Sequence, residues 1–506
     1  MVQLPRVKLD ATLADFYNLS DPGNGRPAVG QVLCGTNSGV SLSEHFARNA
    51  RYLYQDSAFN KTPKGQLNDS NNKLRRSLAI KYLSLVPQRD AFICGRSPVV
   101  LFDIHKSDGD VERDRRQAER TLLVLESNQR PSLIWCSGPG NIPAKKTNVR
   151  KLAYKVALDD LAKYPLAVDL EQHWYVNSKQ ALATSGLPTP ACNIIELTGY
   201  CPDASTCCKG CRTGGSLFVP TECTGLRGTW MDEQINNVLD RISLRSLPFV
   251  LKNQQTFGGA GTYVVTTEEE CSDLLDDFSG GLLRKLFSQV TSDNYHLKPG
   301  TILLSDMVRD PISNYGLTFF VSANGDATFI GVSEQMTDCS QAWVGSTIDY
   351  ARQNQLREKF WVIMHEIAGW LHKHDYYGPA GADILENRSF DESRFEQSRT
   401  EFHIVDLNAR TTGSLCLPLL RSHFESRGLG FASSFSITVD QPRDRFIDQW
   451  KTAFQEGRLC ILSWYEDQEE GIGVGDVAMG AEDEKTLQMQ MDSLRQATIE
   501  VSSRLL

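Results

Sequence analysis

Polar side chains whose chemistry suits a metal–phosphate site lie near residues 381–410. Gly381-Ala382-Asp383 overlaps the start of one short apolar run, Ala382 to Leu385, and Asp406-Leu407-Asn408-Ala409-Arg410 overlaps the end of another, Phe402 to Leu407. The charged stretch Glu386 to Thr400 separates the runs, which predicts a hairpin with a long loop. Residues i and i+2 of a strand face the same side, so Asp406, Asn408 and Arg410 are expected to project together. Asp383 can join them from the paired strand.

The ligand types favour a hard cation. Carboxylate and amide oxygens, without cysteine or histidine, suit Mg²⁺ or Mn²⁺, which usually bind phosphates as well. The nearby Arg410 suits a phosphate or a carboxylate. A polar strand end with solvated side chains is the alternative interpretation of the same residues.

A second motif suits phosphate binding. Leu247 to Lys252 has the pattern of a buried strand ending in a lysine, and Phe257-Gly258-Gly259-Ala260-Gly261-Thr262 leads into Tyr263-Val264-Val265. A glycine-rich loop between two strands can place backbone N–H groups over phosphates, and Lys252 would add a charge there. An ordinary glycine-rich hairpin is the alternative. A P-loop and a Rossmann fingerprint both fit poorly, because no lysine–serine pair and no clear helix follow the glycines.

The two motifs, in this order, resemble the ATP-grasp superfamily over roughly residues 176–430. Further segments agree with the family in order along the chain: Ser178 to Leu182 as its first helix, Ser185 to Pro190 as the following turn, Ile302 to Val308 as the adenine strand and hinge, Tyr315 to Gln335 as a long hairpin, Gln353 to His374 as a helix, and Tyr377 to Asp383 as its Gly-x-x-Gly-x-Asp turn.

The resemblance implies a role for each matching position. Its metal ligands correspond to Asp383, Asp406 and Asn408; its phosphate-binding residues correspond to Lys252, Gly258, Gly259, Gly261 and Thr262; its adenine hinge corresponds to Asp306, Met307 and Val308. Arg410 matches an arginine that some branches use on the reacting group, so Arg410 and Lys252 are the expected catalytic residues. The sequence departs from the family at Asp406, where glutamate is usual, and at the hinge, where Ser305 and Asp306 replace a glutamate.

The implied reaction is the activation of a carboxylate by ATP and Mg²⁺ (or Mn²⁺), followed by attack of an amine. The expected enzyme is an ATP-dependent carboxylate–amine ligase that acts on a small, amino-acid-like carboxylic acid and an amine, and releases ADP and phosphate. Two alternatives stay open: an ATP-grasp kinase acting on a small molecule, and a nucleotide-binding protein without turnover. The sequence does not name the acid or the nucleophile.

Composition excludes other classes of function. The formal net charge is −9 and no long Lys/Arg run occurs, which argues against a nucleic-acid partner. No signal peptide and no apolar run of ~20 residues is visible, so a cytoplasmic protein without membrane contact is expected. A homodimer is left open.

Cysteines are numerous, and six of the thirteen fall in one stretch: Cys192, Cys201, Cys207, Cys208, Cys211 and Cys223. Disulfides are disfavoured without a secretory signal. The spacing matches no standard zinc pattern, so free thiols in an exposed loop are favoured over a tetrahedral zinc site. Residues 200–228 are interpreted as a cysteine-rich insertion.

The expected fold class is α/β and α+β, with an ATP-grasp fold in the centre. Residues 1–175 are expected to form an α/β pre-ATP-grasp domain, because strand patterns at Ala91 to Cys94, Val99 to Phe102 and Leu133 to Cys136 alternate with helical segments. Residues 176–430 are the expected ATP-grasp domain. Residues 431–506 are the expected small C-terminal α+β unit, with a flexible glycine-rich loop at Gly471 to Asp476.

Overall fold

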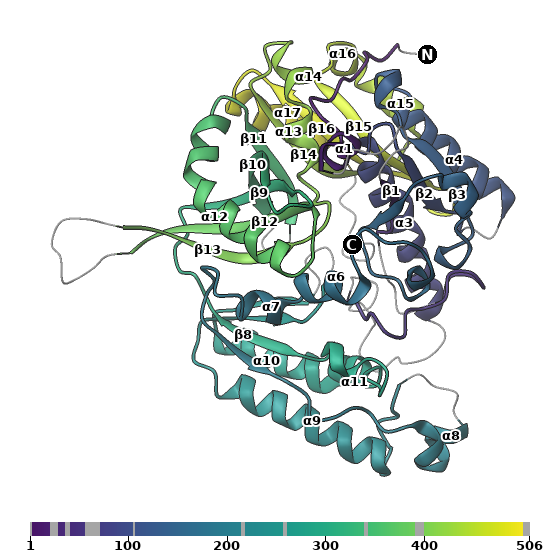
Figure 1. Cartoon of the computed structure of the whole chain (residues 1–506), viewed down its shortest axis with the longest axis vertical. Coiled ribbons are helices and arrows are strands. Elements are labelled where there is room, and N and C mark those ends of the chain that lie inside the picture. The colour runs from purple at the N-terminus through teal and green to yellow at the C-terminus, as the bar shows by residue number, and fades with distance from the viewer. Residues whose placement is uncertain are drawn as a thin grey trace.

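The computed structural model describes residues 3–20, 29–35, 41–55, 71–104, 107–213, 218–256, 261–337, 343–389 and 399–498. Three sheets organise them (Figure 1): a four-stranded parallel sheet, an eight-stranded antiparallel sheet and a four-stranded antiparallel sheet. The expected combination of α/β and α+β structure is therefore confirmed.

The N-terminal part contains the parallel sheet, in the order β3-β2-β1-β4. Its strands are β1 (Val29–Val32), β2 (Pro98–Phe102), β3 (Ser132–Cys136) and β4 (Lys151–Tyr154). Its main helices are α1 (Leu13–Ser20), α3 (Asn71–Phe92) and α4 (Asp108–Leu122), with the short α5 (Ala144–Thr147) before β4. The strand expected at Ala91 to Cys94 is wrong: α3 runs to Phe92 and a turn follows. These residues are almost fully buried, and a short apolar run does not distinguish a strand from a buried helix end.

A smaller lobe follows, built on the sheet β5-β8-β6-β7. Its strands are β5 (Cys192–Ile195), β6 (Phe249–Asn253), β7 (Thr262–Val265) and β8 (Ile302–Asp306), and its helices are α8 (Lys209–Thr213), α9 (Leu226–Ser243), α10 (Glu268–Asp277) and α11 (Leu283–Phe287). Two short helices, α6 (Leu170–Val176) and α7 (Lys179–Ala183), lead into it. Helix α9 buries Met231, Ile235, Val238 and Ile242 in the lobe's core, a helical spacing that leaves its other face to solvent.

The large sheet has the order β13-β12-β9-β10-β11-β14-β16-β15. Its strands are β9 (Ser313–Val321), β10 (Ala327–Thr337), β11 (Trp343–Asp349), β12 (Gly378–Ser389), β13 (Arg399–Asn408), β14 (Phe431–Val439), β15 (Leu459–Asp467) and β16 (Ile472–Ala481). Helix α12 (Gln353–Lys373) packs on β9 and β10. The remaining helices are α13 (Cys416–Leu419), α14 (Arg421–Glu425), α15 (Arg443–Gln449), α16 (Lys451–Gln455) and α17 (Glu484–Gln496).

The C-terminal strands continue the sheet of the preceding region. Strand β14 pairs with β11, with Gly345 opposite Phe435. At the sheet's edge, the buried Gln88 of α3 donates to the Trp464 carbonyl (3.0 Å) and accepts from its backbone N–H (3.0 Å). This amide satisfies the outward-facing backbone groups of the edge strand β15 and joins the N-terminal part to the C-terminal strands.

The hairpin that carries the candidate site is longer than expected. Its strands β12 and β13 pair from Gly381 opposite Asn408 to Ser389 opposite Arg399, so Glu386 lies in a strand and not in the loop. Glu386 is buried and its carboxylate pairs with the Lys359 ammonium of α12 at 2.6 Å. This ion pair allows charged residues to extend a strand where the sequence pattern predicted a loop. Residues 390–398 lie outside the described part.

The glycine-rich segment at Gly471 to Asp476 is not a loop, because strand β16 begins at Ile472. Trp464 of β15 lies opposite Gly475, and its ring covers both Gly473 and Gly475. A Cβ atom on either glycine would lie 2.7 Å from a Trp464 ring carbon. These glycines therefore make room for a buried indole across the strand pair.

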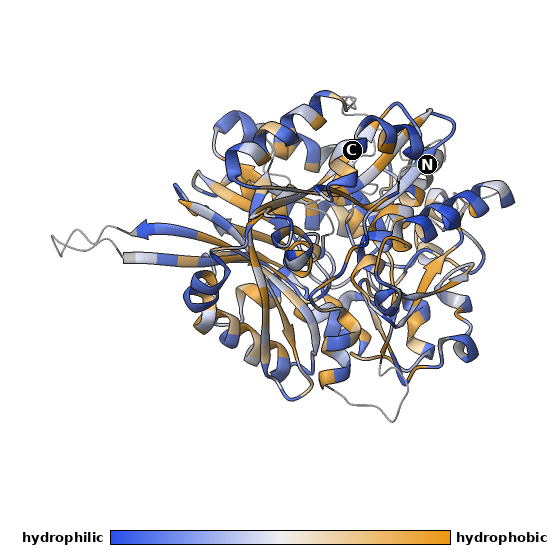
Figure 2. Cartoon of the chain, turned by 90° about the horizontal axis from the view of Figure 1, so that it is seen from above, coloured by the Kyte–Doolittle hydropathy of each residue, from blue (hydrophilic) through white to orange (hydrophobic). Residues whose placement is uncertain are grey.

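Apolar residues gather on the strands and on the inner faces of the helices, whereas outward helix faces are hydrophilic (Figure 2). Among the described residues, none of the helices combines the length and the apolar character that a membrane crossing needs.

We expect Gly475→Ala to lower the free energy of unfolding by about 1–3 kcal/mol, because the new methyl group forces the Trp464 ring and the adjoining backbone apart. Gly369→Ala is the matched control: it lies in α12 with no heavy atom within 4 Å of the new Cβ. The control should stabilise the helix by about 0.5–1 kcal/mol. Denaturant unfolding of both variants measures the difference, and equal behaviour would contradict the packing role of Gly475.

Candidate functional site

The two predicted carboxylates meet on neighbouring strands. Asp383 of β12 lies directly opposite Asp406 of β13, and Gly381 lies opposite Asn408. Directly opposed residues of an antiparallel pair project to the same face of the sheet, with Cβ atoms about 4.5–5.5 Å apart. Asp406 and Asn408 share that face by their spacing, and Asn408 Nδ2 donates to Asp406 Oδ2 at 3.5 Å. The hairpin thus brings the three predicted metal ligands together.

Two lysines reach this group of acids from other elements. Lys179, at the start of α7, forms an ion pair with Asp406 Oδ1. Lys252, on β6 of the smaller lobe, donates through Nζ to the Val405 carbonyl, next to Asp406. The large sheet therefore supplies the acids, whereas α7 and the smaller lobe supply the ammonium groups.

The charges have unequal effects on the two acids. Burial raises the pKa of Asp383, and the neighbouring Asp406 carboxylate raises it further. Burial also acts to raise the pKa of Asp406, but the ammonium groups of Lys179 and Lys252 outweigh it, so this pKa lies below its usual range. Burial lowers the pKa of Lys252. Asp406 is therefore the acid that the surrounding charges keep ionised.

Hydrogen bonds orient Asp383. Gln335 of β10 donates from Nε2 to Asp383 Oδ1 at 2.9 Å, and its own Oε1 accepts from the Ser346 hydroxyl at 3.0 Å. The two acids and Asn408 are a donor set that fits a hard divalent cation, because a cation would relieve the repulsion between two partly buried carboxylates.

The predicted strand–loop–strand is present in the smaller lobe. Strands β6 and β7 pair, with Lys252 opposite Thr262, whose side chain is exposed. Gly261 has φ of +74° and its Cβ would lie 2.6 Å from Asn253 Nδ2, so this position requires glycine. Gly258 and Gly259 lie outside the described residues.

The predicted hinge lies at a cleft of about 820 Å³. Asp306 ends β8 and forms an ion pair with Arg245, and Met307 and Val308 also line this cleft. Strand β6 places Phe249 opposite Asp306, three residues before Lys252. At ~3.3 Å per residue the hinge and the lysine are about 10 Å apart along the sheet. The hinge residues are therefore on the same sheet as Lys252, three residues away from it along β6.

Arg410 borders a separate small cavity between the N-terminal part and the large sheet. Its Nη1 donates to Asn177 Oδ1 at 2.8 Å, and Tyr154, Lys155 and His173 also line the cavity. Burial, assisted by the Arg410 charge, lowers the pKa of His173 to about 3, so this ring is neutral at neutral pH. Burial likewise lowers the pKa of Lys155 to about 8, against the opposing effect of Asp90.

Asp90 binds two residues next to this cavity, Lys155 and Thr411. Its carboxylate, on α3, accepts from Lys155 Nζ at 2.7 Å and from the Thr411 hydroxyl at 3.0 Å. Both side chains of the ion pair are almost fully buried. Because Thr411 follows Arg410, this contact sets where Arg410 stands relative to the N-terminal part.

Three contributors to the site escaped the sequence analysis: Lys179, Gln335 and Asn177. The sequence position of Lys179 could have indicated its role. A lysine in the first turn of a helix is unfavourable because of the helix dipole, so its presence there suggests a contact with an anionic group. Its N-cap, Ser178, accepts from the Ala181 backbone N–H at 3.1 Å. Asn177 accepts from the Ala409 backbone N–H at 3.0 Å, which no local pattern indicates.

Comparisons with known proteins give structural likenesses of low identity. No protein-family model and no curated protein matches the chain. An ADP complex of N5-carboxyaminoimidazole ribonucleotide synthetase is similar with a TM-score of 0.47 and 10% identity, covering 97% of both chains. The same enzyme from Thermus thermophilus gives 0.45 and 13%, covering 94% of this chain and 99% of that one. The biotin carboxylase domain of 2-oxoglutarate carboxylase from Hydrogenobacter thermophilus, solved with MgADP and bicarbonate, gives 0.44 and 10%, covering 93% and 90%. At these values the likenesses assign no activity or substrate to this chain.

Proposed function

We propose that this chain is an ATP-grasp enzyme, an ATP-dependent carboxylate–amine ligase that releases ADP and phosphate. One observation carries the proposal: two opposed carboxylates of the large sheet, Asp383 and Asp406, face ammonium groups brought from α7 and the smaller lobe. Phosphoryl transfer needs this combination, because it depends on charge neutralisation and positioning rather than on covalent help from the protein. The ordered motifs over residues 176–430 support the same family.

In this proposal Asp383, Asp406 and Asn408 hold Mg²⁺ (or Mn²⁺), which when bound supplies positive charge to the ATP phosphates. Lys252 and Lys179 exchange their present contacts with Val405 and Asp406 for phosphate oxygens. The adenine end extends along β8 toward Asp306, Met307 and Val308. Gly261 and Thr262 belong to the loop over the phosphates. The N–H groups of such a loop bind phosphate oxygens, and the closed loop excludes water from the reacting group.

Arg410 is assigned to the carboxylic acid substrate. Its cavity contains a second cation, Lys155, and the neutral His173, whose Nε2 is buried without a protein partner among the described residues. Because Asp90 neutralises Lys155, Arg410 carries the charge that is available for binding, and an arginine beside a neutral ring suits a carboxylate better than an amine. The cavity lies between the N-terminal part and the large sheet, where residues far apart in sequence can select the substrate.

The reaction then runs in two steps. A carboxylate oxygen of the acid attacks the γ-phosphorus of ATP, the bond to the β-phosphate oxygen breaks, and ADP leaves. The amine nitrogen next attacks the acyl carbon of the acylphosphate; phosphate leaves with the original carboxylate oxygen, and the nitrogen loses a proton.

We assign residues 1–175, 176–430 and 431–506 to the pre-ATP-grasp, ATP-grasp and C-terminal units of this enzyme, although the last two share one sheet.

Asp406→Asn and Asn408→Ala test the metal ligands. Each should lower kcat by at least ~100-fold, a loss of roughly 3 kcal/mol in transition-state stabilisation, because metal charge is lost at the phosphates. The melting temperature should change little. Asp273→Asn, an exposed acid of α10, is the control. Steady-state ADP release measures the effect, and activity within about threefold of wild type in either variant refutes the metal assignment.

Lys252→Ala tests the phosphate contact from the smaller lobe. ATP binding and turnover should weaken together, since a phosphate contact acts in both the ground state and the transition state. Lys179→Met should behave similarly and also release Asp406 from its ion pair. Lys373→Ala, an exposed lysine at the end of α12, serves as control. Titration with ATP and initial rates give both quantities; normal use of ATP by the Lys252 variant would contradict the alignment of β6.

Product analysis tests the reaction class. Amino acids and related acids are screened in pairs with amines for phosphate release, and ADP is the expected nucleotide product. With the correct acid and no amine, hydroxylamine should give a hydroxamate. Oxygen-18 in the acid's carboxylate should appear in the released phosphate. AMP with pyrophosphate would refute the mechanism in favour of adenylation, whereas ADP with a stable phosphorylated alcohol would establish the kinase alternative.

A further inference from the structure

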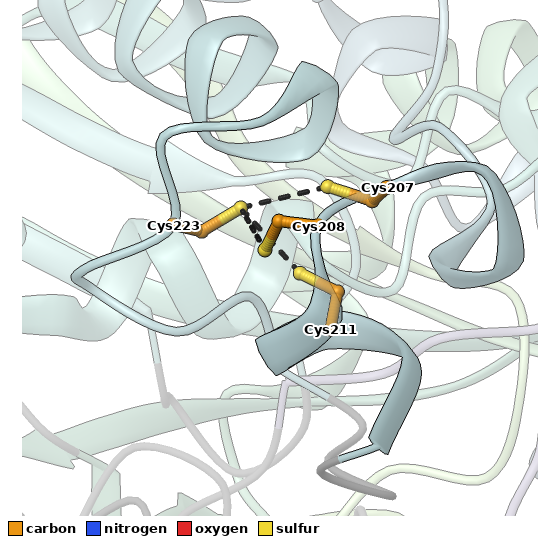
Figure 3. Close-up of side chains that lie close together, drawn as sticks. All are labelled: Cys207, Cys208, Cys211 and Cys223. Atoms are coloured by element: carbon orange, nitrogen blue, oxygen red, sulfur yellow. Dashed lines mark hydrogen bonds between the residues drawn. The ribbon is translucent and has the colours of Figure 1, made fainter.

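Four cysteine sulfurs converge at one end of the smaller lobe, far from the candidate active site. The Sγ atoms of Cys207, Cys208, Cys211 and Cys223 all lie within 4.8 Å of one another. Figure 3 shows these side chains pointing toward a common centre. The sulfurs of Cys207, Cys208 and Cys211 lie 3.6, 3.7 and 3.4 Å from that of Cys223.

The distances between the four sulfurs fit a single metal ion better than a disulfide or an iron–sulfur cluster. A disulfide needs sulfurs about 2.05 Å apart, and all four cysteines are free. A tetrahedron of thiolates around zinc, with Zn–S of about 2.3 Å, has sulfur–sulfur edges of roughly 3.8 Å, close to the values here. An iron–sulfur cluster places several ions between its thiolates and needs more room. The arrangement therefore fits a single ion with four sulfur ligands.

The expectation of an exposed loop of thiols is wrong. Cys207, Cys211 and Cys223 are buried, as is the nearby Cys201, and only Cys208 is partly exposed. They belong to the core of the smaller lobe together with Met231 of α9. Buried thiols pack well as apolar groups, but four sulfurs directed at one another rather than at carbon side chains require a further reason.

Short turns and two glycines allow the backbone to lie close to the four sulfurs. Cys207 follows a short 3-10 turn (Ala204–Thr206), and Cys208 directly precedes α8, which contains Cys211. Cys223 lies three residues before α9 begins at Leu226. A Cβ on Gly225 would lie 2.8 Å from Cys207 Sγ, and one on Gly228 would lie 1.6 Å from the Cys223 carbonyl oxygen. Both glycines let α9 approach the sulfurs closely.

A charged group near the sulfurs suits thiolates. The buried Arg227 guanidinium donates from Nε to Cys201 Sγ at 3.5 Å. Four thiolates around a dication carry a net charge of −2, which the neighbouring Arg227 guanidinium partly offsets.

We propose that Cys207, Cys208, Cys211 and Cys223 bind one zinc ion in a structural site. Four protein ligands fill the tetrahedron and leave no position for a substrate, so the ion stabilises the fold and takes no part in the reaction. It joins the 207–211 segment to the start of α9.

Helix α9 links this site to the predicted adenine hinge. The helix is about 27 Å long, and Arg245, just beyond its C-terminal end, forms an ion pair with the hinge residue Asp306. Figure 1 shows α8 at the far end of α9 from the large sheet.

The test measures metal in the full-length protein, purified without chelators. Elemental analysis should find about one zinc per chain, and a mercurial reagent should release it. Cys207→Ser and Cys211→Ser should lose it. Two controls should keep it: Cys201→Ala, a buried cysteine of the same segment outside the cluster, and Cys271→Ser, a buried cysteine of α10.

Wild-type protein provides a second arm that does not depend on how the variants fold. Chelation should lower its melting temperature, and added Zn²⁺ should restore it; Co²⁺ in place of zinc should give the visible absorption of a tetrahedral thiolate complex. Absence of metal with unchanged stability after chelation overturns the proposal, as does zinc that persists in both serine variants. Iron with a red colour would overturn it in favour of a mononuclear iron–thiolate site.

Discussion

The ion pair between Asp90 and Lys155 is buried within the N-terminal part, and the Asp90 carboxylate also accepts from the Thr411 hydroxyl, which follows strand β13 of the large sheet. This shared carboxylate positions the end of β13, and with it Arg410, against the N-terminal part. Two opposite charges without water between them hold each other strongly, and removing one partner of such a pair typically costs about 3–5 kcal/mol. Lys155 lines the cavity that Arg410 borders, and the ion pair therefore holds Lys155 beside Arg410, on the side where we place the acid substrate.

A second set of charges joins the large sheet to the smaller lobe. The acids Asp383 and Asp406 come from one hairpin, and Lys179 and Lys252 reach them from α7 and β6. Without a nucleotide these groups satisfy one another. In the proposed function a bound metal and the phosphates replace those contacts, which gives a physical reason for the two lobes to close around ATP.

Several elements were predictable because local patterns specify them. The strand β8 and the pairing of β6 with β7 match their expected positions, as do the long hairpin of β9 and β10 and helix α12. The segment at Gly471 to Asp476 was misassigned because a glycine serves equally in a loop and beneath an aromatic ring. Only the position of Trp464 across the strand pair distinguishes these two uses.

For the site, the sequence by itself determined the residue types and their order: two acids and an amide at strand spacing, a lysine before a glycine-rich loop, and an arginine beyond them. Tertiary structure alone decided which acid is kept ionised, because that depends on ammonium groups distant in sequence, Lys179 and Lys252. It also decided that the four thiols meet at one point, since Cys223 is twelve residues beyond Cys211 and joins Cys207, Cys208 and Cys211 only through folding of the segment before α9. Electrostatic and metal-ligand interactions depend on distance in space, and local sequence patterns specify distance only within a single strand, turn or helix.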